Sequence, residues 1–577
     1  MDSVLPFDRR FFRSDAVFSR IGEGGLGGKA DGLIRIRNTL DERLEGRVDG
    51  VEVGIPRVVV IATGPFDQFM EENDLHELAV SDAPDDRIAH AFQNGDLPTE
   101  MLGDLRSVAA EVRSPLAVRS SSLLEDAVEQ PFAGIYETKM IPNNQPDADT
   151  RYHRLVEAVK LIWASTYFSS AKTYRKVAGI PDADEKMAVM IQEIVGRRYG
   201  DRFYPDISAV CRSYSYYTIG RARPEDGVVS LALGLGKTIV DGGLCWSYAP
   251  TRPKAPRPFT STRQMLQETQ STFWAVNMGR PPAYDPIAET EYLLEASLED
   301  AEYDGTLRHL ASTYDAESDR LRPGMAFDGP RVLDFAPLLQ HRELPLNDLL
   351  VALLEVSEEA LGTEVEIELA IALGTDSEPT RAGFVQVRPM RAPSGEVEVT
   401  PESLDEGVVL FSDRTMGNGV ESGITDVVYV KPDGFEARHT EAIAGEIERV
   451  NRRLVDEGRP YLLMGFGRWG SSDPWLGIPV LWGHVAGVRV LVEATLPAMD
   501  VEPSQGSHFF HNLSNTGALY FSVHHSQDPG VDWDWLDGLE AVEETSWIRH
   551  VRTPPLEARV DGRTGRGMVR RDCTQEG

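Results

Sequence analysis

The sequence predicts an α/β (α+β) protein of two or three domains, and three observations lead to that prediction. The chain has 577 residues, whereas a typical domain has roughly 150. Hydrophobic residues make up 41% of it and charged residues 26%, a composition that builds cores and excludes a disordered or fibrous chain. Short β-branched runs alternate with longer segments of helical periodicity along most of the sequence.

The first third of the chain is predicted to alternate helices and strands. It contains, in order, a glycine-rich loop leading into an amphipathic helix at 20–40, a buried strand at 55–63, helical segments at 85–112, and a strand at 115–122. The strand at 115–122 ends in a run of serines, which places polar side chains at the end of a buried element.

The middle of the chain continues this alternation. We expect a helical segment at 151–177, a strand at 188–195, and a strand, a glycine turn and a short element within 228–243. A helix near 346–360 and strands at 365–373 and 384–390 follow. The turn-rich loop between the last two strands predicts an antiparallel hairpin. An acidic stretch at 281–320 is expected to be mostly a solvated helical face.

Charge and cysteine usage exclude several classes of function. Asp and Glu exceed Lys and Arg, 92 to 58, for a formal net charge of -34, which argues against nucleic acid or an anionic membrane as a partner. The three cysteines lie far apart without a C-x-x-C pair, so neither a disulfide framework nor a cysteine-based zinc site is expected. The sequence shows neither a signal-peptide pattern nor a long apolar window, and we expect a soluble, cytoplasmic protein.

Three glycine-rich segments are similar to nucleotide-binding loops but fail as motifs. Residues 234–238, GLGKT, would end a P-loop, but Leu231 stands where its first glycine is required. Residues 24–29, GGLGGK, fail in the same way. Gly22, Gly24 and Gly27 fit G-x-G-x-x-G, but we expect no parallel strand before them, so a Rossmann site is not predicted.

Two basic residues are candidates for phosphate binding. Lys29 follows the glycine-rich loop and could reach a phosphate, or it could be a solvated lysine at the start of a helix. Arg119 ends a strand beside serine hydroxyls and could bind phosphate with two parallel hydrogen bonds. A surface salt bridge is the alternative for Arg119.

The hairpin carries two pairs of polar residues, each on one face of its strand. Glu366 and Glu368 are two residues apart, as are Gln386 and Arg388 on the partner strand. Paired acids within an apolar run are costly unless they are solvated or neutralised. The set could hold Mg²⁺ and a nucleotide, because Mg²⁺ takes oxygen ligands and bridges phosphates; otherwise this face is the wet side of a sheet.

These residues carry a resemblance to a known family. Eight ordered blocks contribute to it: LGGKADGL (26–33), IPRVVVIATGPFDQFM (55–70), LAVRSSSLLEDAVEQPFAGIYET (116–138), IWASTYFSSAKTYRKVAGI (162–180), MAVMIQEIV (187–195), LGLGKTIVDG (233–242), VEIELA (365–370) and VQVRP (385–389). Together they resemble the nucleotide-binding N-terminal domain of phosphoenolpyruvate synthase and pyruvate phosphate dikinase. The resemblance covers residues 20–392 and implies an ATP-grasp-type fold with two lobes.

The resemblance also implies cofactors and roles for the candidate residues. Lys29 and Arg119 would contact the phosphates of ATP, and Gln192 would lie near the nucleotide. Arg388 would stabilise charge on the transferred group, which makes Arg119 and Arg388 the catalytic arginines.

For the metal, the resemblance implies that Glu368 and Gln386 hold Mg²⁺ and the nucleotide, with Glu366 nearby.

Three departures from the family limit this comparison. Its histidine carrier has a T-S-H-x-A type motif, and none occurs after residue 390. The roughly 185 residues after the linker are too few for the family's pyruvate-binding barrel, which needs about 250. Lys237 replaces an acidic residue after the GLG turn, so complete pyruvate chemistry within this chain is not expected.

The C-terminal part has two dense blocks of its own, LLMGFGRWGSSDPWLGIPVLW (462–482) and EPSQGSHFFHNLS (502–514). They resemble the tail of uncharacterised bacterial proteins similar to phosphoenolpyruvate synthase. Arg468 and the Ser471–Asp473 turn could bind an anion or a sugar. His508 could accept a phosphoryl group or act in acid–base chemistry, and a structural histidine is the alternative.

The sequence thus predicts an ATP-dependent phosphotransferase that uses Mg²⁺ and passes a phosphoryl group to a histidine or to a small, pyruvate-like acceptor. His508 is the best histidine candidate on the chain. The alternative is a non-catalytic ATP-binding sensor or scaffold. The expected division is an N-terminal lobe at 1–210, a second lobe with the metal-binding strand pair at 211–392, a linker at 393–403, a smaller α+β domain at 404–548 and an Arg-rich tail at 549–577.

Overall fold

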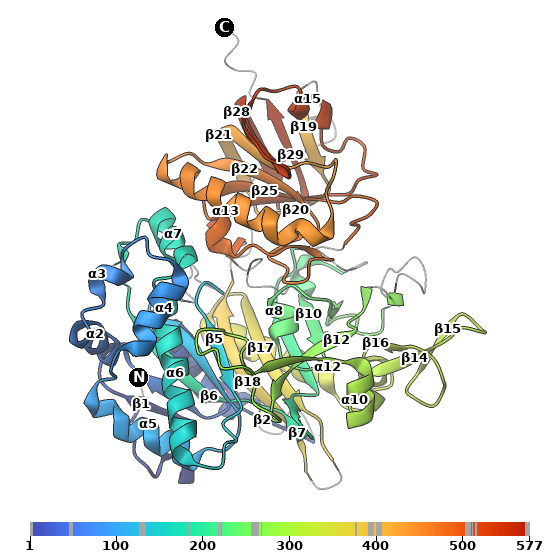
Figure 1. Ribbon diagram of the computed structural model, residues 1–577. Helices are drawn as coiled ribbons and strands as arrows, with labels where there is room; N and C mark the ends of the chain where they lie inside the picture. Colours follow the sequence, from blue (N-terminus) through green and yellow to red (C-terminus); the bar gives the residue numbers. More distant parts are fainter. Residues whose placement is uncertain are drawn as a thin grey trace.

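The computed structural model is a mixed α/β structure built on several sheets (Figure 1). It describes residues 4–44, 50–125, 134–182, 185–216, 219, 222–255, 265–266, 268–375, 378–390, 397–399, 407–501, 509, 512–513, 516–562 and 564–571. Most of the expected linker and His508 lie outside these residues.

The first sheet has five strands in the order β1-β3-β6-β4-β5. Its strands are β1 (Phe18–Ile21), β3 (Val58–Ile61), β6 (Met187–Glu193), β4 (Leu116–Ser122) and β5 (Thr138–Ile141). β1 and β3 are parallel, and the other neighbours are antiparallel. Every residue of β4 is buried, as its continuous apolar and serine run predicts.

Helices cover this sheet. They are α2 (Thr63–Glu72), α3 (His76–Ala79), α4 (Asp85–Asn94), α5 (Thr99–Glu111), α6 (Ala148–Ser165) and α7 (Ser169–Ala178). α6 contacts β4, β5 and β6, and α4 and α5 pack on α6. Trp163 of α6 is fully buried against Phe66 and Phe69 of α2.

The second sheet has six strands in the order β11-β10-β9-β17-β18-β2. Its strands are β11 (Trp246–Tyr248), β10 (Val228–Ala232), β9 (Ile207–Arg212), β17 (Val365–Ala372), β18 (Thr380–Pro389) and β2 (Val51–Gly54). The hairpin predicted at 365–390 is confirmed as β17 and β18. Helices α1 (Gly28–Leu44) and α12 (Leu346–Leu361) pack on this sheet and on each other, and α8 (Lys237–Val240) follows β10.

Two smaller sheets extend the second. One contains β7 (Arg197–Tyr199), β8 (Arg202–Tyr204), β12 (Thr272–Asn277) and β13 (Leu293–Ser297), and the other contains β14 (Ala311–Asp315), β15 (Arg320–Pro323) and β16 (Arg331–Leu333). The associated short helices are α10 (Leu298–Asp304) and α11 (Ala336–Leu339), with the 3-10 turns η3 (Pro224–Asp226) and η4 (Leu307–His309). The expected helical face at 281–320 is therefore wrong: within it only α10 is α-helical. Strands β13 and β14 form there because β13 pairs with β12, and β14 pairs with β15 and β16.

The boundary expected at residue 210 also lies too late. β7, β8 and β9 occupy 197–212, and they pair with strands of the later sheets. Conversely, β2 crosses from the first part to lie parallel to β18. The sequence alone cannot reveal such exchanges, because they depend on which strand edges meet in the folded chain.

The C-terminal part is a nine-stranded sheet with the main order β19-β29-β28-β21-β22-β25-β26-β20, and β27 pairs with β28. Its strands are β19 (Val408–Ser412), β20 (Arg414–Met416), β21 (Gly419–Val430), β22 (Tyr461–Phe466), β25 (Val488–Ala494), β26 (Leu519–Val523), β27 (Ala541–Glu544), β28 (Ile548–Asp561) and β29 (Arg566–Arg571). This part also contains a two-stranded sheet of β23 (Arg468–Trp469) and β24 (Gly477–Ile478). Its helices are α13 (Thr440–Asp456) and α15 (Trp533–Asp537), and its 3-10 turns are η6 (Ala437–His439) and η7 (Trp482–Val485). One further 3-10 turn, η1 (Phe11–Arg13), precedes β1 near the N-terminus.

Residues 549–571 are not an Arg-rich tail. They form most of β28 and all of β29, which pair with β21 and β19 inside the sheet. Leu556, Ala558 and Val560 are buried at alternate positions of β28, while Arg552 is exposed. The strand period of two explains why a basic segment can be a core element.

Both faces of the nine-stranded sheet are covered. Val427 and Tyr429 of β21 belong to one apolar cluster, whereas Val428 and Val430 belong to another. The second cluster continues into the helices of the first sheet, so the C-terminal part shares a core with the N-terminal part. Figure 1 shows the C-terminal part, in orange and red, above the parts of the chain that are built on the first and second sheets.

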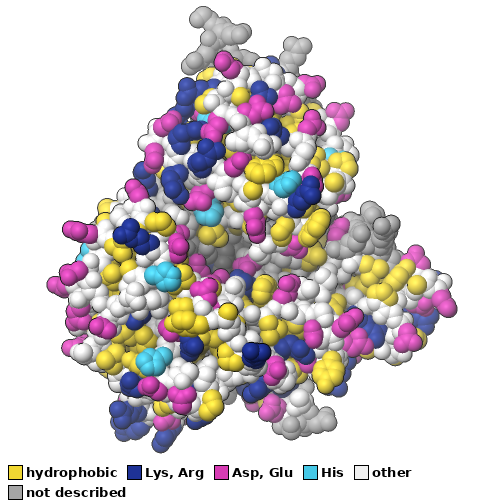
Figure 2. Space-filling model, viewed as in Figure 1, with side chains coloured by type: hydrophobic (Ala, Val, Ile, Leu, Met, Phe, Trp, Pro, Cys, Tyr) yellow, Lys and Arg dark blue, Asp and Glu magenta, His cyan; other side chains and the backbone are white. Residues whose placement is uncertain are grey.

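No helix among the described residues is long and apolar enough to cross a membrane. Acidic side chains are scattered over the face in Figure 2 rather than gathered in one patch, and the surface is hollowed where the three parts meet.

Candidate functional site

The glycine-rich loop places Lys29 at the start of α1. Gly27 has a φ of +80°, and an added Cβ would lie 1.7 Å from the carbonyl oxygen of Ser121. Only glycine allows this approach, which brings the N-terminus of α1 against β4. The Lys29 ammonium donates to Ser120 (3.0 Å) and pairs with Glu125 (2.7 Å). At 7% exposure, Lys29 is a buried, paired group rather than a solvated lysine.

One expectation about this loop is wrong. A parallel strand does precede Gly22, Gly24 and Gly27, because β1 runs parallel to β3. All three glycines have positive φ values. The strand, loop and helix therefore follow one another as in a phosphate-binding turn, although the surrounding sheet is mostly antiparallel.

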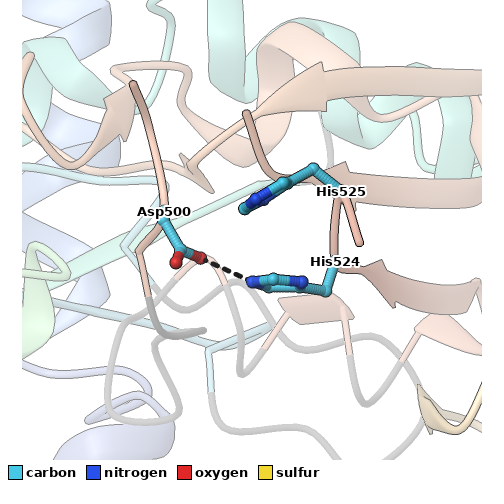
Figure 3. A group of neighbouring side chains, drawn as sticks. All are labelled: Asp500, His524 and His525. Atoms are coloured by element: carbon cyan, nitrogen blue, oxygen red, sulfur yellow. Dashed lines mark ion pairs between the residues drawn. The ribbon is translucent and has the colours of Figure 1, made fainter. Parts of the chain in front are cut away.

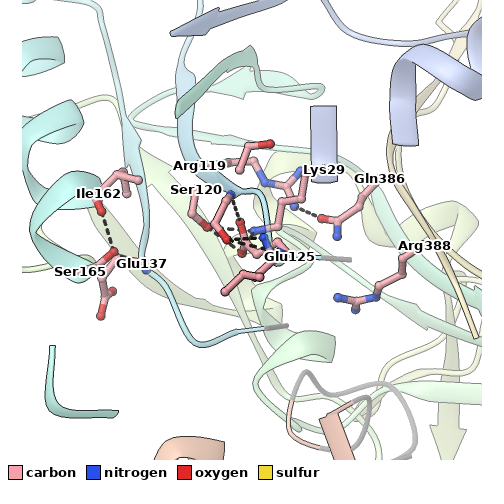
Figure 4. A network of polar contacts seen from close by, with 12 residues as sticks. Lys29, Arg119, Ser120, Glu125, Glu137, Ile162, Ser165, Gln386 and Arg388 are labelled. Atoms are coloured by element: carbon pink, nitrogen blue, oxygen red, sulfur yellow. Dashed lines mark hydrogen bonds and ion pairs between the residues drawn. The ribbon is translucent and has the colours of Figure 1, made fainter. Parts of the chain in front are cut away.

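Arg119 joins the two large sheets. It lies on β4, and its guanidinium donates to Gln192 Oε1 on β6 (3.3 Å). It also donates to the Val385 carbonyl (3.3 Å) and to Gln386 Oε1 on β18. Arg119 is only 8% exposed, so a surface salt bridge is excluded. Figure 4 shows Arg119 and Gln386 meeting beside Lys29.

Glu366 lies between two arginines that are directly across from it on the neighbouring strands. Arg388 of β18 and Arg212 of β9 both pair in register with Glu366 of β17. Arg388 Nε donates to one carboxylate oxygen at 2.7 Å, and Arg212 Nε donates to the other. All three side chains are at most 2% exposed. The face is therefore not the wet side of a sheet, and its buried charges are compensated by one another.

Glu368 lies one pleat further along β17, opposite Gln386. Its carboxylate is 3.6 Å from the guanidinium groups of both Arg119 and Arg388, which is longer than a hydrogen bond. A β-bulge follows it, between Glu368 and Leu369, and such bulges re-aim side chains. Glu368 is 14% exposed as a side chain and lines a cavity.

This cavity, of about 240 Å³, lies between the first and second sheets. Its apolar walls include Met140, Ile194, Leu235 and Leu293. Arg119, Gln192 and Glu368 contribute a first polar group of lining residues. A largely apolar cavity with a few polar side chains is the usual form of a small-molecule site.

A second polar group lines the same cavity: Glu137, Lys237, Asp241 and Glu289. Lys237 pairs with Asp241 (2.7 Å) and Glu289 (3.4 Å). Burial and the nearby Glu289 carboxylate raise the pKa of Glu137, which favours the protonated form of this carboxyl. Sequence reasoning missed Glu137 and Glu289, because strand and loop residues far apart in sequence meet only in the fold.

The loop expected to bind an anion or a sugar packs on the wall of this cavity. Arg468 donates to the carbonyls of Gly242 (2.8 Å) and Gly243 (3.2 Å), and the Ser472 amide donates to the Asp241 carbonyl (3.3 Å). Leu481, from the same C-terminal part, lines the cavity. The C-terminal part therefore contributes to the site.

The structure thus brings together seven of the eight predicted site residues: Lys29, Arg119, Gln192, Glu366, Glu368, Gln386 and Arg388. The eighth, His508, lies outside the described residues.

Comparison with known proteins gives a family for this chain. A family model described as "Pyruvate phosphate dikinase, AMP/ATP-binding domain" matches residues 23–407. The chain is 25% identical over 432 residues to a phosphoenolpyruvate synthase of Aeropyrum pernix, covering 69% of this chain and 45% of that protein.

Two further relatives match shorter segments. An "Uncharacterized phosphotransferase YvkC" of Bacillus subtilis is 26% identical over 190 residues, 33% of this chain and 20% of that protein. A probable phosphoenolpyruvate synthase of Staphylothermus marinus is 29% identical over 134 residues, 22% of this chain and 15% of that protein. The chain spans less than half the length of each of these relatives.

The match over residues 23–407 covers well over half of the chain. It includes most of the glycine-rich loop, both large sheets except β1, and every lining residue of the cavity except Leu481. It confirms the resemblance seen in the sequence. The chain belongs to the pyruvate phosphate dikinase AMP/ATP-binding domain family.

Proposed function

We propose that this protein binds ATP with Mg²⁺ in the cavity between its two large sheets and transfers a phosphoryl or pyrophosphoryl group to an acceptor. In this proposal the sheets are the cores of the two lobes of an ATP-grasp-type domain. The observation that carries it is the convergence of Lys29, Arg119 and Arg388 with Glu368 beside a mostly apolar cavity. The family description and the printed names of the relatives, a phosphotransferase and phosphoenolpyruvate synthases, support it.

The two sets of polar residues that line the cavity suit the two ends of a nucleotide, its phosphates and its base. The apolar walls suit the flat face of an adenine, and a protonated Glu137 can donate a hydrogen bond to a ring nitrogen. Arg119 and Lys29 suit the phosphates, since guanidinium binds phosphate with parallel hydrogen bonds and ammonium acts as a compact charge. Glu125 already pairs with Lys29, so phosphate would compete with Glu125 for this ammonium.

The metal proposal rests on the oxygen donors present. Glu368 and Gln386 lie opposite each other on paired strands and offer carboxylate and amide oxygens, the donors that Mg²⁺ prefers. When bound, Mg²⁺ would neutralise charge on the phosphates. Glu366 has a different proposed role, because both of its oxygens accept hydrogen bonds from arginines. It positions Arg388.

The proposed reaction exchanges one bond to phosphorus for another. The bond between the terminal phosphorus of ATP and its bridging oxygen breaks, a bond from that phosphorus to the acceptor forms, the acceptor loses a proton, and ADP leaves. Transfer of a pyrophosphoryl group breaks the next bridging bond instead and releases AMP. Arg388 and Arg119 stabilise the charge on the transferred group, so catalysis comes from positioning and electrostatics.

Substitutions at the strand pair test this proposal. Glu368→Gln keeps the shape of the side chain and should reduce ATP turnover by roughly a hundredfold or more, the usual cost of losing one charge-stabilising contact. Arg388→Lys retains a positive charge beside Glu366 and should also lose turnover, because an ammonium cannot reproduce the planar fork of Arg388. Release of ADP and AMP is the measurement, and circular dichroism checks folding.

Arg381→Ala is the matched control, since Arg381 is an exposed arginine on the same strand as Arg388. It should keep wild-type turnover. Unchanged turnover in both Glu368→Gln and Arg388→Lys would show that the strand pair is not the site of phosphoryl transfer.

A second candidate function is a nucleotide sensor or scaffold that binds ATP without transferring a group. One observation favours it. Lys237, which stands where the resembled family has an acidic residue, has a side chain that is 15% exposed and is held by Asp241 and Glu289 in the cavity wall. The sensor would bind ATP stoichiometrically and release neither ADP nor AMP.

A further inference from the structure

The carboxyl ends of the parallel strands in the nine-stranded sheet gather a group of polar residues that the proposed ATP site does not use. β21, β22, β25 and β26 are mutually parallel neighbours. The segments that follow them therefore leave the sheet at one edge, and in parallel sheets this edge is where ligands bind. Arg468 follows β22, Asp500 lies beyond β25, and His524 and His525 follow β26 directly.

Three of these side chains form a compact cluster (Figure 3). Asp500, His524 and His525 each present one ligand atom, and these atoms all lie within 4.8 Å of one another. Nε2 of His524 is 3.2 Å from a carboxylate oxygen of Asp500. The two imidazole rings lie against each other with their centroids 4.2 Å apart. The cluster is exposed, so an ion can reach it from solvent.

Neighbouring hydroxyl groups hold both rings by their other nitrogen. Nδ1 of His525 is 2.9 Å from the hydroxyl of Thr495, which also accepts the His525 amide at 2.9 Å. Nδ1 of His524 is 2.7 Å from the hydroxyl of Ser526. Partners of this kind fix the orientation of imidazoles that bind metals, and Nε2 of His524 faces the carboxylate of Asp500.

We propose that Asp500, His524 and His525 bind a divalent first-row transition metal ion such as Zn²⁺. Two imidazoles and one carboxylate suit Zn²⁺, Co²⁺ or Ni²⁺, whereas Mg²⁺ and Ca²⁺ take oxygen ligands. In a tetrahedral site with bonds of about 2.0–2.1 Å the ligand atoms lie about 3.4 Å apart, so small rotations of exposed side chains close the cluster around an ion. Three protein ligands leave one position for water or an anionic oxygen ligand.

This site is separate from the proposed Mg²⁺ site in both chemistry and place. It does not depend on ATP, and its ligands belong to the C-terminal part. The same edge of the sheet contacts the wall of the ATP cavity through Arg468 and Ser472. The proposal can therefore succeed or fail independently of the proposed function.

Titration with Co²⁺ alone tests the site, because Co²⁺ in a site with imidazole ligands absorbs visible light. The full chain, stripped of metal and kept in millimolar Mg²⁺, should bind Co²⁺, and Zn²⁺ should displace it. His524→Ala and His525→Ala should each weaken binding by roughly tenfold or more, at least the cost of losing an outer partner. Thr495→Val should weaken binding by about tenfold through ring orientation.

His153→Ala is the matched control. His153 is an exposed histidine beside the carboxylate of Asp149 (3.4 Å), which makes it a histidine–aspartate pair without a second imidazole. This variant should bind Co²⁺ as the wild type does. The proposal is overturned if wild-type protein and the His524→Ala/His525→Ala double variant give the same Co²⁺ isotherm, and thermal melting shows that the double variant is folded.

Discussion

Glu366 shows how a single buried charge determines what its neighbours can do. Leaving a buried carboxylate without compensation costs several kcal/mol, and the paired strands supply Arg388 and Arg212 on either side. Arg388 is thereby held next to Glu368. A sequence reader sees two acids on one strand face, but only the three-strand register shows that one of them is occupied by arginines while the other lines the cavity.

At the residue scale, Glu137 gives a pH-dependent prediction. Its pKa, raised to about 8 by burial and by Glu289, lies above its ordinary value of 4.5, so the neutral form predominates below pH 8 and is lost above it. Bound ATP is an anion and favours the neutral form. ATP affinity should therefore fall as pH rises through 8, by up to about tenfold per pH unit.

Isothermal titration between pH 7 and 9 measures this effect, and Glu137→Gln should flatten it because an amide stays neutral. Lys237, Asp241 and Glu289 face the same space and are left unchanged in that variant. Glu193→Gln is the control, because it alters a cavity carboxylate that accepts a hydrogen bond from the Ser114 hydroxyl (2.8 Å). This variant should keep the wild-type dependence of ATP affinity on pH. An equal pH slope in wild type and Glu137→Gln would contradict the assignment to Glu137.

At the scale of elements, the contact between η7 and α7 joins the C-terminal part to the rest of the chain. An added Cβ at Gly483 would lie 2.2 Å from the carbonyl oxygen of Ser170, so the two backbones meet where only glycine fits. Lys176 of α7 and Asp456 of α13 form an ion pair nearby. Since Leu481, two residues before Gly483, lines the cavity, this contact also shapes the ATP site.

Gly483→Leu should separate η7 from α7, because overpacking of this kind costs about 1–3 kcal/mol. Hydrogen exchange in α7 should become faster, and ATP should bind more weakly. Gly445→Ala is the control: Gly445 lies on an exposed position of α13, where an added Cβ meets nothing within 4 Å. Exchange in α7 that is the same in Gly483→Leu and in the wild type would show that this contact does not hold the parts together.

Helices and strands with a clear hydrophobic periodicity were predictable from the sequence, whereas the pairing of strands was not. The buried strands at 116–122 and 187–193 and the hairpin of β17 and β18 follow from apolar runs and turn residues. The short strands at 293–297 and 311–315 do not, because their acidic surroundings have a helical appearance while tertiary pairing decides their structure. The Arg-rich strands β28 and β29 were missed for the same reason.

Several residues of the candidate site were predictable from the sequence, but the full set of residues was not. Lys29, Arg119, Glu368 and Arg388 lie within blocks that resemble a known family. Glu137 lies in such a block too, but only the fold brings it to Lys237 and shifts its pKa. The Asp500, His524 and His525 cluster joins residues from two loops, and no spacing rule connects them.

At the scale of the whole molecule, the net charge of -34 and an anionic ligand are compatible because the charges are separated. Acidic side chains are spread over the visible surface (Figure 2), whereas Lys29, Arg119, Arg212 and Arg388 are buried around one site. The C-terminal part lies against this site through Arg468 and Leu481. The negative net charge thus reflects the surface side chains, whereas buried cations surround the site.

Incubation of the full chain with Mg²⁺ and ATP labelled at either the β- or the γ-phosphate distinguishes phosphoryl transfer from ATP binding alone. We expect release of ADP or AMP together with acid-labile label on the protein or on an added small acceptor, and loss of both in Glu368→Gln. Mass spectrometry at alkaline pH, which preserves phosphohistidine, locates the label. Stoichiometric binding of ATP with neither nucleotide release nor label would contradict phosphoryl transfer and identify the protein as an ATP sensor.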